Sequence, residues 1–289
     1  MAATPLYFQP MKESLLAISA ASPLHIWGID ELSNIVSRAV DGSWHKQPAL
    51  PGTDVGSISC GADGTVMAVG RNRKLYRYVP EQNVPPLADG NPWREVTGIS
   101  DVAAVSVGSC QWIAVVITTS GASSVELYLG EGKTVAAKGN PALFGSPGRC
   151  YMDAEGHIHA IGENTKELWT TTGSMVQWPF TASWFQLDIS FEHDLLNVCS
   201  GGNNTRFLLH QNELHQLLAN TYTEQVQPML RTWNDTTKKW DFSPLNGPYG
   251  WISGFASNRL WLQTSPEEGV FKMYETLPIQ NPEHWAPPS

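Results

Sequence analysis

The 289-residue sequence has few charged residues, few cysteines and no long apolar run. Asp, Glu, Lys and Arg make up 16% of it, and 18 basic residues stand against 27 acidic ones, so the formal net charge is −9. Nucleic acid and anionic membranes attract clustered Lys and Arg, so this composition argues against both as partners. No apolar stretch approaches the ~20 residues that cross a bilayer.

The cysteines stand singly and far apart, at Cys60, Cys110, Cys150 and Cys199. They form no CxxC pair, which argues against a zinc or redox centre. The N-terminal residues lack the basic start and unbroken apolar core of a signal peptide, so we expect a cytoplasmic protein. HExxH, GxSxG, Walker and EF-hand motifs are all missing, and we expect neither a metal nor a cofactor.

Glycine (25 residues), proline (20) and tryptophan (12) are abundant instead. This composition favours short strands joined by tight turns over helices. The clearest unit, residues 54–81, reads DVGSISCGADGTVMAVGRNRKLYRYVPE. It predicts a strand, a turn at Ala62-Asp63-Gly64, a second strand, a basic turn and a third strand.

Similar units recur along the chain. The second residue of the second strand serves as a marker, and successive markers are 40 to 54 residues apart: Ile26, Val66, Ile113, Ile158, Arg206 and Leu260. A four-stranded propeller blade has about this length. The sequence therefore predicts an all-β fold, a six-bladed β-propeller that forms a single domain over residues 1–289.

Two further patterns support blades. Five units carry a tryptophan at the start of a later strand, which we interpret as packing between neighbouring sheets: Trp44, Trp93, Trp184, Trp240 and Trp285. The last unit stops one strand short, and the N-terminal segment LLAISAAS has the character of the missing strand. We therefore expect the N-terminal strand to pair with the last blade and close the ring.

The opening LYFQPMKESLLAISAASPLHIWGIDELSNIVSRAVDGSWHK resembles the first blade of the fungal fucose-specific lectins, which are six-bladed propellers. The stretch ISCGADGTVMAVGRNRKLYRY is more similar to a tectonin-type blade, which also occurs in lectins. In fucose-specific lectins each sugar site pairs an Arg with a Glu on the next strand, beside an aromatic ring. The resemblance therefore implies carbohydrate binding between blades.

The contact residues of those lectins are mostly replaced here. The Arg position of the first blade falls near His25, and only Glu275 keeps a Glu at a comparable place. Only Arg206 and Arg259 stand on the strand that should carry Arg. A multivalent lectin repeats its contacts in every blade, whereas at most one or two sites around Arg206 or Glu275 are expected here.

A single asymmetric pocket is the alternative to repeated sugar sites. We expect the marker strands to be innermost, so that their third positions line a central channel: Trp27, Met67, Ala114, His159, Phe207 and Trp261. Large apolar groups with few polar handles are typical of a small-molecule site. Trp27, Met67, Phe207, Trp261 and His157 are the candidate substrate-binding residues, and Arg259, Arg206 and His159 the candidate catalytic ones. Ordinary packing between blades is the competing interpretation.

His157 and His159 would point to one face of a strand, where two histidines at this spacing are either metal ligands or structural histidines. Asp63, Asp153 and Glu155 lie in predicted turns, where Asp commonly bonds to the local backbone. No third metal ligand is evident near the two histidines. We therefore expect structural histidines and no bound metal.

Three functions remain open at this point. Some fungal cyclases of natural-product assembly, including hetero-Diels–Alderases, have lectin-like propellers, and this resemblance implies a cofactor-free pericyclase acting on a small apolar natural product. Such a site needs aromatic walls and one or two donors aimed at a carbonyl. The alternatives are a lectin that binds a glycan and a scaffold for protein partners. A homodimer is compatible with each.

Overall fold

A computed structural model describes residues 4–80, 90–108, 112–119, 122–129, 135–138, 147–153, 156–162, 167–171, 184–187, 194–202, 205–210, 212–218, 222–255, 259–267, 270–277, 280 and 285. The chain divides into two compact units, Leu15–Leu195 and the combination of Met1–Ser14 with Leu196–Ser289. Within the described residues no helix has the length and apolarity that crossing a membrane requires.

The unit Leu15–Leu195 contains four antiparallel sheets of four strands, each in chain order. The first has β2 (Leu15–Ser22), β3 (His25–Asp30), β4 (Ile35–Arg38) and β5 (Trp44–Lys46). The second has β6 (Val55–Cys60), β7 (Val66–Gly70), β8 (Leu75–Tyr78) and β9 (Trp93–Glu95). The third has β10 (Val102–Val107), β11 (Trp112–Thr119), β12 (Ala122–Leu129) and β13 (Val135–Lys138). The fourth has β14 (Pro147–Met152), β15 (Ile158–Gly162), β16 (Leu168–Thr171) and β17 (Trp184–Gln186).

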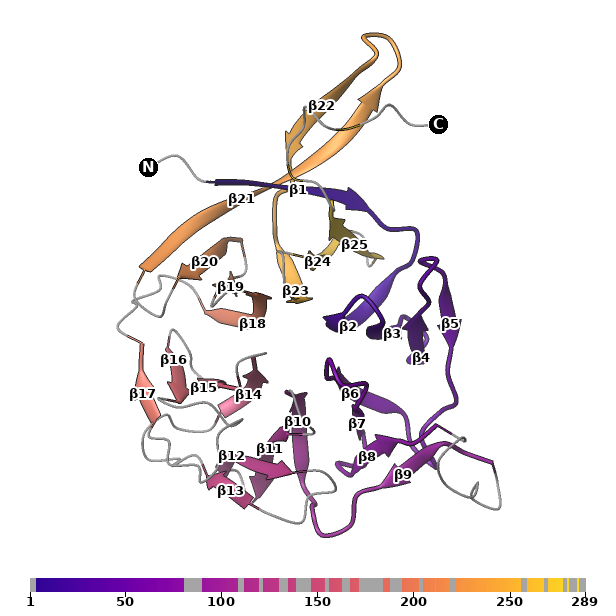
Figure 1. The fold of residues 1–289 in the computed structure, drawn as a ribbon, viewed down its shortest axis with the longest axis vertical. Coiled ribbons are helices and arrows are strands. Elements are labelled where there is room, and N and C mark those ends of the chain that lie inside the picture. Colours follow the sequence, from indigo (N-terminus) through magenta and orange to yellow (C-terminus); the bar gives the residue numbers. More distant parts are fainter. Residues whose placement is uncertain are drawn as a thin grey trace. The chain divides into compact units, whose positions relative to one another are not determined.

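The other unit is built on a nine-stranded sheet with the order β18-β19-β20-β21-β1-β25-β24-β23, and β22 pairs with β21 (Figure 1). Its strands are β1 (Thr4–Pro10), β18 (Leu195–Gly202), β19 (Thr205–His210), β20 (Leu214–Leu218), β21 (Tyr222–Asn234), β22 (Lys239–Pro244), β23 (Tyr249–Phe255), β24 (Arg259–Glu267) and β25 (Val270–Thr276). The all-β propeller prediction is confirmed, but the described structure has four separate blades and this larger sheet. The predicted six equal blades are not distinct, because the parallel pairing of β1 with β21 joins two runs of four strands.

The N-terminal strand pairs with the last strand of the chain, as expected, but it is not the predicted segment. Thr4–Pro10 pairs antiparallel with β25, with Gln9 opposite Glu275. The segment LLAISAAS is β2, the first strand of the first sheet. The prediction selected the more apolar stretch, whereas β1 alternates: Leu6 and Phe8 are buried, and Tyr7 and Gln9 are half-buried.

In the unit Leu15–Leu195 the core lies between successive sheets. In the second sheet Val66, Ala68 and Tyr76 pack against the first sheet. The residues next to these in the chain pack against the third sheet: Met67, Val69 and Leu75. Both faces of a sheet are therefore apolar, which explains why the strands read as continuous hydrophobic runs rather than as an alternation.

A serine hydroxyl connects the first strands of consecutive sheets. Ser19 Oγ on β2 accepts a hydrogen bond from the Cys60 backbone N–H on β6, at 3.0 Å. Ser59 accepts from Val107 N–H at 3.0 Å, and Ser106 accepts from Met152 N–H at 2.8 Å. We call these three contacts the serine ties. Tyr151 occupies the equivalent register position in the fourth sheet, opposite His159.

The marker strands are not the innermost ones. β2, β6, β10 and β14 contact one another and form one edge of their sheets, while β3, β7, β11 and β15 are the second strands (Figure 1). The marker positions predicted strands correctly but were assigned to the wrong place in the sheet. A second strand is hydrogen-bonded on both edges and covered on both faces, so its side chains pack between sheets. Trp27, Met67 and Ala114 are accordingly found in core clusters between neighbouring sheets.

Candidate functional site

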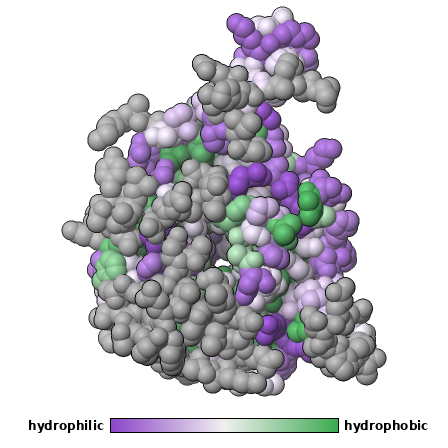
Figure 2. All heavy atoms as spheres, in the orientation of Figure 1, coloured by the Kyte–Doolittle hydropathy of each residue, from purple (hydrophilic) through white to green (hydrophobic). Residues whose placement is uncertain are grey.

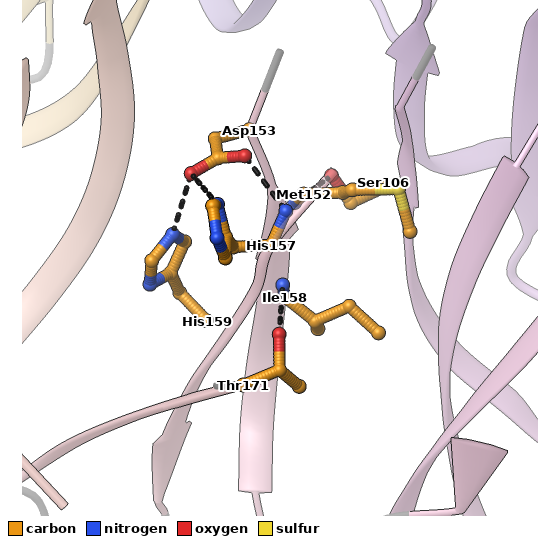
Figure 3. Close-up of polar contacts among 7 residues, drawn as sticks. All are labelled: Ser106, Met152, Asp153, His157, Ile158, His159 and Thr171. Carbon is orange, nitrogen blue, oxygen red and sulfur yellow. Dashed lines mark hydrogen bonds and ion pairs between the residues drawn. The ribbon is translucent and has the colours of Figure 1, made fainter. Parts of the chain in front are cut away.

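The two predicted histidines of the fourth sheet meet at one carboxylate (Figure 3). Asp153 Oδ2 lies 3.3 Å from His157 Nδ1 and 3.2 Å from His159 Nε2. Asp153 and His159 are buried, at 1% and 0% exposure, whereas the His157 side chain is 23% exposed. The hairpin turn creates this arrangement, because Asp153 Oδ1 also accepts the His157 backbone N–H at 2.8 Å.

These contacts define a carboxylate held between two imidazoles. The predicted turn role of Asp153 is confirmed, and so is that of Asp63, whose Oδ1 accepts the Thr65 N–H at 3.0 Å. Glu155 lies outside the described residues. Within the part of the chain that the structure describes, no group of three or more His, Cys, Asp or Glu side chains is arranged to hold a metal ion. Tyr151 stacks on His159, with ring centroids 6.1 Å apart.

Two of the candidate substrate-binding residues lie deep in the unit Leu15–Leu195. Trp27 is 8% exposed, and its ring contacts those of Tyr78 and Trp93, at 4.9 and 6.3 Å. Met67 is fully buried among the valines between the second and third sheets. Both side chains fill space between sheets, and any role in substrate binding remains a prediction.

The remaining candidates lie on the nine-stranded sheet. Arg206 and Phe207 on β19 are 2% and 1% exposed. Arg259 and Trp261 on β24 are half-buried and fully buried. The Arg259 Nε and Trp261 Nε1 groups are buried and have no hydrogen-bond acceptor within the described residues. Trp261 contacts the ring of Phe255, with centroids 5.6 Å apart. His157 and His159 belong to the other unit of the chain.

The nine-stranded sheet also brings together polar residues from three strands that are adjacent in space. Gln9 on β1 is directly opposite Glu275 on β25. The parallel register that places Phe8 beside Leu230 brings Gln9 level with Arg231 on β21. Residues opposite one another in a ladder point to the same face of a sheet. Arg231, Gln9 and Glu275 therefore form a transverse set on one face, which we call the polar row.

Hydrogen bonds connect the polar row from end to end. Arg231 Nη2 donates to Gln9 Oε1 at 3.0 Å, and Gln9 Nε2 donates to Glu275 Oε1 at 2.9 Å. The amide orientation of Gln9 is fixed, because a guanidinium only donates and a carboxylate only accepts. All three side chains are half-buried. Partial burial lowers the pKa of the Arg231 guanidinium from its ordinary value, and it stays charged at neutral pH.

Aromatic rings surround the Arg231 end of the row. The guanidinium carbon lies 4.3 Å from the ring centroid of Trp240 and 4.9 Å from that of Trp285. These two rings meet edge-on, and Trp285 also contacts Tyr7 and Phe242. The Trp240 Nε1 group is buried and has no acceptor within the described residues. We call these four rings the aromatic wall.

The hairpin of β21 and β22 positions this wall. Trp233 and Trp240 are opposite one another, as are Arg231 and Phe242, so all four side chains lie on the same face. Trp233 and Trp240 are in edge-on contact at 5.1 Å. The turn that joins the strands, residues 235–238, is polar, and the tip of the hairpin at the top of Figure 2 is coloured as hydrophilic. The aromatic residues are therefore confined to the part of the hairpin beside the polar row.

Sequence reasoning identified part of this site. The lectin resemblance points to Glu275, and the tryptophan pattern predicts that Trp240 and Trp285 pack between sheets. Those two tryptophans instead contact Arg231, whereas Trp93 is fully buried in a core cluster as predicted. Arg231 and Gln9 were missed, although the alternation Arg231-x-Trp233 followed by Trp240-x-Phe242 could have indicated a hairpin with one functional face.

Known proteins resemble this chain in two ways: a family model matches part of its sequence, and solved structures share its fold. A model of the Tectonin domain family matches residues 1–116, which contain β1, the first two four-stranded sheets, β10 and the beginning of β11. The search of curated proteins finds no match.

Several solved structures are similar in fold. One is a gluconolactonase from Xanthomonas campestris, with a TM-score of 0.57, 10% identity and coverage of 91% of this chain and 89% of that one. Another is the calcium-binding protein regucalcin from Agrobacterium tumefaciens, with a TM-score of 0.57, 10% identity and coverage of 95% and 97%. YCF48 from Cyanidioschyzon merolae gives a TM-score of 0.54 at 14% identity, with coverage of 92% and 96%. At such identities the likeness shows the fold alone: the chain is a β-propeller whose first 116 residues match the Tectonin domain.

Proposed function

We propose that this protein binds carbohydrate, and that the polar row with its aromatic wall is the binding site. The observation that carries the proposal is the hydrogen-bonded row Arg231–Gln9–Glu275 beside the rings of Trp240 and Trp285. Sugars present hydroxyls at their edges and apolar C–H groups on their faces. Charged groups and amides grip the hydroxyls, and an indole covers the face.

Two independent features support the proposal. The match of residues 1–116 to the Tectonin domain agrees with the resemblance to lectin blades. The site is also asymmetric: it needs β1, β21, β22 and β25 together, and β22 is an additional strand on the nine-stranded sheet. One such site is in keeping with the replaced contact residues elsewhere. It favours a monovalent sugar binder over the multivalent type.

The test is binding to a glycan array, followed by titration calorimetry with the best ligand. The Glu275→Ala variant is expected to weaken binding by about 10- to 100-fold, because a hydrogen bond to a charged group contributes about 1.5–3 kcal/mol. A Glu95→Ala variant is the matched control, since Glu95 is a half-exposed carboxylate on β9 of another sheet. Equal affinities for the wild type and Glu275→Ala would place the sugar elsewhere, and an empty array would end the proposal.

A cofactor-free cyclase of natural-product assembly is the second candidate. The observation in its favour is the pair of buried polar groups on β24, Arg259 Nε and Trp261 Nε1, which have no acceptor within the described residues. Such donors could stabilise charge developing on a substrate carbonyl. Incubation with a quinone-methide precursor and a terpene alkene tests it. Adduct formation above the protein-free rate should be lost in Trp261→Ala, and full activity in that variant and in Arg259→Ala would reject the assignment.

We also propose that the nine-stranded sheet contains two blades of the propeller. The nine-stranded sheet contains two runs, β18-β19-β20-β21 and β1-β25-β24-β23, each with four strands as in a blade. We count them as a fifth and a sixth blade of one domain over residues 1–289. An experimental structure with five or seven repeats around its axis would refute this count.

A further inference from the structure

Arg231 is a cation without a countercharge in the described part of the chain. Its polar contact there is the single hydrogen bond to Gln9, and no described carboxylate forms an ion pair with it. The rings of Trp240 and Trp285 shield it from water on the sides that they cover. A guanidinium has five N–H donors, and the Gln9 bond uses one of them.

This arrangement is pre-organised for an anion. Arg in a fixed plane binds carboxylates through two parallel hydrogen bonds, and two aromatic contacts hold that plane in place. Cation–π contacts compensate for part of the lost hydration of the guanidinium, but they do not satisfy its N–H groups. An incoming carboxylate would supply both the missing acceptors and the missing charge.

The two ends of the polar row differ in charge. Arg231 is positive and Glu275 is negative, and the neutral amide of Gln9 separates them. The row crosses three strands, so its ends are about 10 Å apart, which is two strand spacings. A ligand as long as a disaccharide could therefore place an anionic group at Arg231 and hydroxyls at Glu275. The reverse orientation would bring two negative charges together.

The charge of the whole molecule limits the number of anionic groups on the ligand. With a formal net charge of −9, the protein repels highly charged polymers such as sulfated polysaccharides. A ligand with one carboxylate is attracted by Arg231 and experiences only weak long-range electrostatic repulsion from the rest of the protein. The structure therefore favours a singly acidic sugar over a polyanion.

We propose that the site selects oligosaccharides that carry one uronic acid residue, whose carboxylate is bound by Arg231 while the neighbouring neutral sugar is bound by Glu275. This inference rests on the proposed carbohydrate binding and adds the chemical class of the sugar. It assigns recognition of charge to Arg231 and recognition of hydroxyls to Glu275.

The test compares uronic-acid disaccharides with their methyl esters, which keep the shape of the sugar and remove its charge. Calorimetry with the wild type should show about 10- to 100-fold tighter binding of the acid than of the ester, and the difference should shrink as salt is added. The probes are disaccharides in which one glucuronic, galacturonic or mannuronic acid residue is joined to a neutral sugar.

Variants of Arg231 test whether this side chain causes the preference for the acid over the ester. Arg231→Gln should lose the preference for the acid, and Arg231→Lys should keep part of it, because a lysine supplies charge without the bidentate fork. Circular dichroism of each variant checks that the sheet is intact, and the acid–ester comparison on the wild type needs no variant at all. Equal binding of acid and ester by the wild type would overturn the inference and leave carbohydrate binding standing. Binding of no sugar would overturn both.

Discussion

Replacing Trp93 with alanine should lower the free energy of unfolding by about 3–5 kcal/mol, the range found when a large buried aromatic side chain is removed. Trp93 is fully buried at the start of β9. Its ring is in edge-on contact with Tyr78 at 5.2 Å and with Trp27 at 6.3 Å, and its Nε1 donates to the Pro48 carbonyl at 2.9 Å. The substitution removes the ring contacts and leaves the Pro48 carbonyl without its donor.

Urea unfolding followed by tryptophan fluorescence and circular dichroism measures this loss. Leu32→Ala is the control, because Leu32 is 83% exposed in the turn after β3 and its removal should change stability by less than about 0.5 kcal/mol. Similar unfolding midpoints for Trp93→Ala and Leu32→Ala would mean that the cluster between the first two sheets contributes little to stability.

Raising the pH above 9 should destabilise the protein through its buried thiols. Burial raises the pKa of Cys60 from 9.0 to about 12, and burial also raises the pKa of Cys199 well above its ordinary value. Between pH 9 and 12 the unfolded chain loses these protons and the folded chain keeps them, so the unfolded state gains stability. At pH 10.5 the shift at Cys60 alone corresponds to about 2 kcal/mol.

The measurement is the free energy of urea unfolding at pH 8 and at pH 10.5, for the wild type and for Cys60→Ser. Cys60 Sγ lies 3.2 Å from the carbonyl oxygens of both Ser19 and His25, either of which can accept its single proton. A serine hydroxyl can donate to the same acceptors without titrating in this range. The pH-dependent loss should be about 2 kcal/mol smaller in Cys60→Ser. An identical loss in both proteins would show that Cys60 does not cause it.

The local sequence pattern was sufficient to predict where the strands lie and how far apart they are in the chain. It was insufficient to predict which strands are neighbours in the folded protein. The marker residues predicted β3, β7, β11, β15, β19 and β24, because each lies in a continuous apolar run next to a turn signal. Which strand forms the inner edge depends on contacts between sheets, and the sequence around Trp27 or Met67 does not contain that information. The N-terminal strand was misassigned for a similar reason, since Leu6 and Phe8 become buried only by pairing with distant strands.

The candidate site was harder to predict because it is assembled across strands. Arg231 and Gln9 are 222 positions apart in the chain, and Gln9 and Glu275 are 266 apart. Only the register of β1 between β21 and β25 makes them neighbours. Glu275 could be singled out because a resemblance pointed to its position. Gln9 lies in a short N-terminal strand without a motif, and nothing in its local sequence distinguishes it.

The serine ties have a consequence for how the individual sheets can vary. The donor in each tie is a main-chain N–H, so the receiving sheet contributes no particular side chain to the junction. Only one hydroxyl on the preceding sheet must be retained, and the rest of each sheet can change in composition without losing the junction. Whole sheets are thus exchangeable modules as far as these junctions are concerned. At Tyr151 a phenol ring replaces the hydroxymethyl group, and the histidine on which it stacks shares a carboxylate with a second one.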